Sequence, residues 1–109
     1  MAAADWKGVA GLLGLAMRAG QGISGEGACV TAIRSGKAVI AMIDAKASQN
    51  AKKRFADACS YHGVPMYELG EDLIGNAVGK PGRMALVLSP GGLADKLRLE
   101  IERAKAEFI

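Results

Sequence analysis

Apolar residues near the start of the chain recur with helical spacing. They follow the i, i+3, i+4 rhythm of an amphipathic helix at Trp6, Val9, Ala10, Leu13, Ala16 and Met17. The rhythm fades at residues 18–20, so a first helix is predicted to end there. Ser24 can cap a second helix, which Gly36 would stop. Its inner face is predicted to hold Cys29, Ala32 and Ile33.

The middle of the chain alternates apolar runs with further helical patterns. Residues 38–43 are continuously apolar, which predicts a strand buried on both faces by helices. Ser48 is a candidate cap for a third helix that ends at Gly63. Its predicted inward residues are Ala51, Phe55, Ala58 and Cys59. A strand at residues 64–69, a short helix at 71–78, a turn at 79–82 and a strand at 83–88 follow.

A last helix follows the break at residues 90–92. Its apolar stripe consists of Leu93, Leu97, Ile101 and Phe108. We interpret this spacing as a core face, although it would also suit an interaction surface. The alternation along residues 1–109 predicts a single-domain α/β fold. We expect a three-layer α/β/α sandwich around a small mixed, largely parallel sheet.

Composition adds a mild preference for a polyanionic partner. The 109 residues carry a formal charge of +3, and the sequence pI is about 9.0. The first 60 residues hold eight Lys and Arg against four Asp and Glu, out of 14 and 11 in the whole chain. An anion-binding face should therefore draw on the first half, unless these are ordinary solvated charges.

Few residues offer catalytic or metal chemistry. Cys29 and Cys59 lack metal-ligand or disulfide-framework spacing and are predicted to be buried, reduced thiols. The single histidine, His62, has no predictable nucleophile or base beside it. We therefore expect no enzyme activity, no metal and no cofactor. Without a signal peptide or a long apolar run, we expect a cytoplasmic protein with no membrane partner.

The stretch GQGISG at residues 20–25 matches the pattern G-x-G-x-x-G. A dinucleotide-binding fingerprint requires a strand before the glycines, and here a helix is predicted instead. A nucleotide cofactor is therefore disfavoured, even though Asp44 closes the next strand as the fingerprint requires. Two interpretations remain for the glycines. They form a tight helix-to-helix corner, or they let a phosphate or base edge approach free N–H groups.

Several motifs together resemble a known family. They are "LGLAMRAG", "SGE", "AIRSGKA", "DAKASQNAKKR" and "IGNAVGKPGR". The series is similar to bacterial YlxQ-type proteins, in the superfamily of the archaeal ribosomal protein L-seven-Ae and the eukaryotic ribosomal protein L-thirty-e. The resemblance covers nearly the whole chain in the same order.

This resemblance implies a non-catalytic RNA-binding protein. Members typically bind a kink-turn, a sharply bent RNA helix with sheared G·A pairs. The resemblance therefore implies a kink-turn or another structured RNA, such as ribosomal RNA, as the partner, and with it the ribosome. The start of the second helix and the loop before the last strand would lie side by side on the RNA. The corresponding positions are Gly25, Glu26, Gly27, Ala28 and Thr31, then Gly79, Lys80, Pro81, Gly82 and Arg83.

The chain departs from strong kink-turn binders at three of these positions. Where those binders carry Asn, Glu or Gln, and Lys, this chain has Gly27, Ala28 and Thr31. The resemblance thus implies weaker or altered specificity, with backbone contacts and three other cations taking a larger share: Arg34, Lys37 and Lys46.

Two interpretations compete with recognition of a folded RNA. Tyr61 and Tyr67 each sit beside predicted core segments, so a protein that stacks single-stranded bases is disfavoured. The alternative function is a protein–protein adaptor of the same fold with little RNA specificity.

Overall fold

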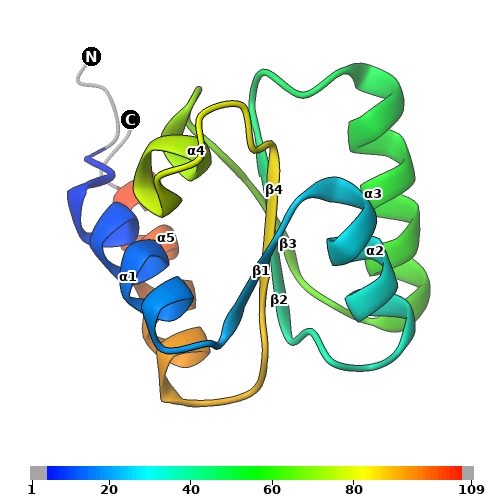
Figure 1. Cartoon of the computed structure of the whole chain (residues 1–109), viewed down its shortest axis with the longest axis horizontal. Helices are drawn as coiled ribbons and strands as arrows, with labels where there is room; N and C mark the ends of the chain where they lie inside the picture. Colours follow the sequence, from blue (N-terminus) through cyan, green and yellow to red (C-terminus); the bar gives the residue numbers. More distant parts are fainter. Residues whose placement is uncertain (1–4, 107–109) are drawn as a thin grey trace.

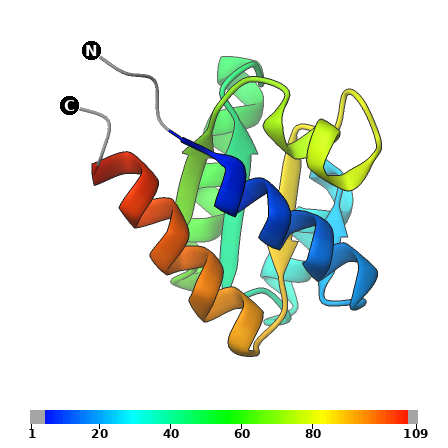
Figure 2. The ribbon, with the colours of Figure 1, turned by 90° about the vertical axis from the view of Figure 1, so that its left-hand side faces the viewer.

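A computed structural model describes residues 5–106 and shows the predicted three-layer α/β/α sandwich. Helices α1, α4 and α5 cover one face of the sheet, and α2 and α3 cover the other (Figures 1 and 2). In chain order the elements are α1 (Lys7–Arg18), β1 (Gly22–Ser24), α2 (Glu26–Arg34), β2 (Ile40–Asp44), α3 (Gln49–His62), β3 (Met66–Leu69), α4 (Leu73–Val78), β4 (Ala85–Leu88) and α5 (Gly92–Ala106).

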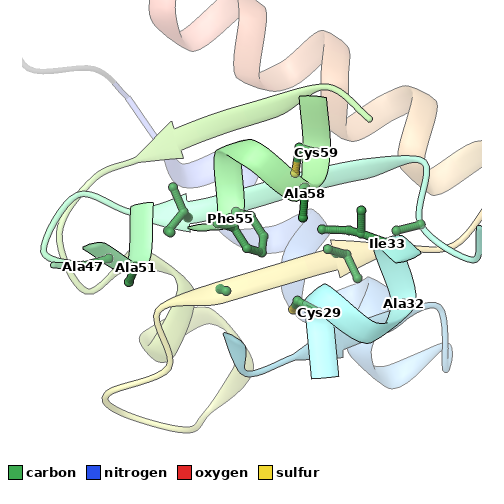
Figure 3. Close-up of a cluster of buried hydrophobic side chains, with 13 residues drawn as sticks. Cys29, Ala32, Ile33, Ala47, Ala51, Phe55, Ala58 and Cys59 are labelled. Carbon is green, nitrogen blue, oxygen red and sulfur yellow. The ribbon is translucent and has the colours of Figure 1, made fainter. Parts of the chain in front are cut away.

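The central strands β2 and β4 are buried on both faces, as continuous apolar runs predict. Successive side chains of a strand point to opposite faces, so each central strand contributes side chains to two hydrophobic cores. Ala41 and Ile43 of β2 belong to the cluster beneath α2 and α3, whereas Met42 belongs to the cluster beneath α1, α4 and α5. Phe55 of α3 fills the middle of the first cluster (Figure 3).

The sheet is mixed, as predicted, but it is not largely parallel. Its strand order is β1-β4-β2-β3, and only β2 and β3 are parallel neighbours. Strand β4 runs antiparallel to both β1 and β2. Helix α4 has six residues and rises only about 9 Å, which is too short to carry the chain back along the sheet. Strand β4 therefore starts at the end of the sheet where β3 finishes, and it runs in the opposite direction.

The short strand β1 was missed by the sequence prediction. It pairs Gly22 with Leu88 and Ser24 with Leu86, so the glycine-rich stretch does not simply join two helices. Gly and Ser are poor strand formers, and a run this short shows no alternation. Ser24 consequently lies in the strand and does not cap α2. The N-cap is Gly25, with φ of +97° and no side-chain cap.

Other boundaries follow the predicted punctuation closely. The Ser48 hydroxyl accepts a hydrogen bond from the Ala51 N–H at 3.1 Å, and α3 ends at Gly63 in the left-handed conformation. Leu97 and Ile101 are fully buried, which confirms the core interpretation of their stripe. Phe108 of the same predicted stripe lies outside the described residues. Within residues 5–106, no helix is long and apolar enough to cross a membrane.

Candidate functional site

The start of α2 and the turn between α4 and β4 lie side by side. The Gly25 N–H donates a hydrogen bond to the Ala85 carbonyl at 3.0 Å, which fixes the start of α2 to the start of β4. The Arg83 side chain lies over Gly25, with Nη1 only 2.5 Å from where a Cβ would stand. Any side chain at position 25 would therefore displace Arg83, in addition to being strained by the positive φ.

The first turn of α2 presents unused hydrogen-bond donors. The N–H groups of Glu26, Gly27 and Ala28 have no hydrogen-bond partner within the described part of the chain. Gly27 and Ala28 are exposed and carry almost no side chain. Thr31 is also exposed, and its hydroxyl donates to the Gly27 carbonyl at 3.1 Å. The helix N-terminus is thus open to an anion or a polar base edge.

The Glu26 carboxylate beside these donors forms an ion pair. Glu26 pairs with Arg54 of α3, with Oε1 2.8 Å from Nη2 and 3.3 Å from Nε. This pair joins the first residue of α2 to the second turn of α3. It also reduces the repulsion that a free Glu26 carboxylate would exert on a phosphate at the helix N-terminus.

The α4–β4 turn is held close to its own helix. A Cβ on Gly75 of α4 would stand 3.0 Å from the Lys80 carbonyl and 3.1 Å from the Gly82 nitrogen. Gly79 and Gly82 both have positive φ, at +72° and +89°. Lys80, Pro81 and Gly82 are exposed, and no ion pair of Lys80 occurs among residues 5–106. The predicted turn therefore presents a free cation next to the start of α2.

Lys46 lies at the same edge of the sheet, but it is already paired. Its Nζ is 3.2 Å from Oδ1 of Asp72. Its backbone N–H donates to the buried Asp44 carboxylate at 2.7 Å. The Asp44 N–H in turn donates to the Met84 carbonyl at 2.8 Å, next to Arg83. Lys46 should therefore bind a phosphate less strongly than an unpaired cation would.

Arg34 and Lys37 are not part of the same cluster. Arg34 closes α2, about 12 Å along the helix axis from Glu26, and Lys37 follows it. Both side chains are exposed. The structure therefore divides the predicted site residues into a main group at the start of α2 and a minor group at its far end.

The sequence interpretation of Tyr61 was wrong. Its side chain is 86% exposed, and its ring meets the His62 ring edge-on with centroids 5.0 Å apart. Tyr67, by contrast, packs against the second core cluster as predicted. Tyr61 occupies the last turn of α3, just before the exposed Gly63. A residue in the last turn of a helix has fewer neighbours than one in its interior. The position of Tyr61 two residues before Gly63 was therefore the sequence feature that could have predicted its exposure.

The two thiols are buried, as predicted. Burial raises the pKa of Cys29 to about 12 and that of Cys59 to about 11. The Cys29 thiol also donates a hydrogen bond to the Ile23 carbonyl at 3.1 Å. Neither group is a ready nucleophile at neutral pH. No set of three or more His, Cys, Asp or Glu side chains within residues 5–106 is placed to hold a metal ion.

Sequence comparisons give one family and two named relatives. Residues 7–97 match the model of the ribosomal protein L7Ae/L30e/S12e/Gadd45 family. "RNA-binding protein YlxQ" of Enterococcus faecium is 42% identical over 92 residues, which is 84% of this chain and 88% of that protein. "RNA-binding protein YlxQ" of Bacillus subtilis (strain 168) is 34% identical over 87 residues, 79% of this chain and 87% of that one.

Solved structures with the same arrangement include two with high overlap. A Bacillus halodurans protein of unknown function superposes with a TM-score of 0.82 and 30% identity, covering 90% of this chain and 99% of its own. The Giardia lamblia 15.5kD RNA binding protein has a TM-score of 0.72 and 18% identity, covering 90% of this chain and 85% of its own. At that identity, the second likeness concerns the fold alone.

Proposed function

This chain belongs to the ribosomal protein L7Ae/L30e/S12e/Gadd45 family, and from that premise we propose that it is a non-catalytic RNA-binding protein. Two relatives, both named RNA-binding protein YlxQ, support RNA as the partner. Family and names also agree with the prediction that the chain is not an enzyme. The proposal extends to a cytoplasmic protein whose 109 residues act as one domain.

The observation that carries the proposal is the open N-terminus of α2. Its three free N–H groups stand beside Arg83 and the α4–β4 turn. RNA is recognised largely through its shape, its phosphates and its unstacked bases, and backbone donors at a helix end can meet each of these. Gly27 and Ala28 leave room for the RNA backbone to approach those donors closely.

The finer part of the proposal concerns the kind of RNA. We assign a kink-turn, or a similarly bent ribosomal RNA, to the surface formed by Gly25, Glu26, Gly27, Ala28, Thr31, Gly79, Lys80, Pro81, Gly82 and Arg83. Arg34, Lys37 and Lys46 are secondary contacts. Because residues 27, 28 and 31 lack long polar side chains, we expect discrimination to depend on backbone donors and on the turn. Selectivity should then be lower than in binders with long polar side chains there.

A titration with two RNAs tests this proposal. One RNA contains a kink-turn, and the other is a matched duplex without the G·A pairs, each measured at two salt concentrations. Lys80→Gln should weaken binding to both RNAs and reduce the slope of log K against log salt by about 1, because one phosphate contact is lost. Lys96→Gln is the matched control, since Lys96 is exposed on α5, which lies on the face of the sheet opposite α2.

The outcomes separate the two levels of the proposal. Selective binding to the kink-turn supports both levels. Equal, salt-sensitive binding to both RNAs leaves an RNA-binding protein but contradicts kink-turn recognition. No binding to either RNA contradicts RNA binding itself. Equal effects of Lys80→Gln and Lys96→Gln would remove the α4–β4 turn from the site.

One observation favours the alternative of a protein adaptor. Leu99 of α5 is 61% exposed and lines a shallow groove of about 370 Å³ between α1 and α5. Exposed apolar surface of this kind is a common feature of protein contacts. An adaptor contact there should respond little to salt, so the same two-salt design applied to a protein partner distinguishes it from RNA binding.

A further inference from the structure

Helices α2 and α3 enclose an open groove on the outer face of the molecule. Its volume is about 820 Å³. Glu26 and Gly27 line the end where α2 begins, and Arg34, Tyr61 and His62 line the other end. Both helices run in the same direction away from the proposed RNA surface (Figure 1). The groove is therefore continuous with that surface, because Glu26 and Gly27 belong to both.

The far end of the groove carries an aromatic ring that the fold does not use. Tyr61 is 86% exposed, the largest value among the exposed large hydrophobic residues of the described chain. The His62 ring lies at an interplanar angle of 68° to it, with the two centroids 5.0 Å apart, which is an edge-to-face arrangement. An exposed ring of this kind is what proteins use to stack an unpaired base.

The charges along the groove suit a single nucleotide better than a run of phosphates. Arg54 is held by Glu26, and the Asp57 carboxylate would repel a phosphate but can accept hydrogen bonds from base amino groups. Arg34 lines the same end as Tyr61, and it has no ion-pair partner within residues 5–106. A base over Tyr61 with its phosphate at Arg34 satisfies this pattern.

We propose that the α2–α3 groove binds an unpaired nucleotide that extends from the structured RNA, with its base stacked on Tyr61. The inference rests on the proposed RNA-binding function and adds a second contact to it. From Gly27 to Arg34 the path along α2 is about 10 Å, a distance that a short single strand can cover. The start of α2 would hold the folded RNA, and the groove would hold its tail.

The test compares a blunt kink-turn RNA with the same RNA carrying a short unpaired tail at its 5′ end or at its 3′ end. Wild-type protein should bind one tailed RNA about 10-fold more tightly than the blunt RNA, because one base is stacked. A 2-aminopurine in that tail should lose fluorescence on binding. In Tyr61→Ala, the ratio of tailed to blunt affinity should fall to about one, and in Tyr61→Phe it should persist.

The exposure of Tyr61 makes these variants informative, because its truncation removes little packing. Leu99→Ala is the matched control, an exposed apolar truncation on the other side of the sheet that should keep the wild-type ratio. If the blunt RNA binds and neither tail helps, only the groove proposal is overturned. The same holds if Tyr61→Ala keeps the preference for the tail. If no RNA binds, the proposed function fails and the groove proposal falls with it.

Discussion

At the residue scale, Asp44 is the one buried charged or polar residue among those described. Its carboxylate links the loop after β2 to the loop before α4. Its Oδ1 accepts the Lys46 N–H and its Oδ2 accepts the Asp72 N–H, each at 2.7 Å. Asp72 is also the only described non-glycine residue with positive φ, at +63°. The carboxylate thus compensates for an unfavourable backbone conformation at the start of α4.

Asp44→Asn should lower the free energy of unfolding by about 1–3 kcal/mol, measured by urea denaturation. An amide keeps one acceptor oxygen but turns an NH₂ group toward a backbone N–H, so a buried donor loses its partner. Asp57→Asn is the control, because the Asp57 side chain is exposed and its carboxylate makes no hydrogen bond or ion pair among the described residues. It should change stability by less than about 0.5 kcal/mol. Equal stability of the two variants would contradict this role for Asp44.

At the element scale, glycine allows α4 and its turn to pack in direct contact. Gly75→Ala should destabilise the fold by about 1–3 kcal/mol, because the new methyl group would meet backbone atoms of Lys80, Pro81 and Gly82 that cannot move independently. It should also weaken RNA binding, since the turn is part of the proposed surface. Thermal unfolding and the RNA titration measure the two effects.

Gly11→Ala supplies the opposite expectation within α1. Apart from its chain neighbours and the backbone of its own helix, no atom lies within 4 Å of a Cβ at that position, so alanine should stabilise the helix by up to about 1 kcal/mol. The contrast separates glycines kept for space from glycines that only weaken a helix. A Gly75→Ala variant as stable as wild type would show that the turn can move away from α4.

The sequence was sufficient for elements whose signal is local and repeated. The helical rhythm of α1, the Ser48 cap and the uninterrupted apolar run of β2 all follow from neighbouring residues. Strand β1 and the antiparallel direction of β4 did not, because Gly22–Ser24 becomes a strand only through its pairing with β4. The adjacency of Arg83 and Gly25 came from family resemblance. The exposure of Tyr61 depended on where α3 ends relative to the sheet.

At the scale of the whole molecule, two cores share one sheet, and both thiols lie in the core beneath α2 and α3. Folding raises the thiol pKa values from 9.0 to about 12 for Cys29 and about 11 for Cys59 because burial disfavours the charged thiolate. The unfolded chain therefore loses these protons first as the pH rises. The associated stabilisation is complete below pH 9.0 and is lost progressively as the pH approaches 11–12.

The free energy of unfolding should accordingly fall as the pH rises above 9.0. Urea denaturation of wild type and Cys59→Ala across this range measures the contribution of one thiol. The variant is expected to be less stable at neutral pH, because it loses buried volume, but its stability should fall less steeply with pH. Parallel pH curves for the two proteins would contradict the role assigned to burial of Cys59.

The two outer strands of the sheet also determine how the protein behaves at high concentration. Strand β1 has three residues and β3 has four, and β3 carries the exposed Glu68, which pairs with Lys52 at 3.1 Å. Long, flat, uncharged edges allow strands of other molecules to add to a sheet, whereas short and charged edges discourage it. The shortness that leaves β1 without a recognisable strand pattern therefore also protects the folded chain against edge-to-edge aggregation.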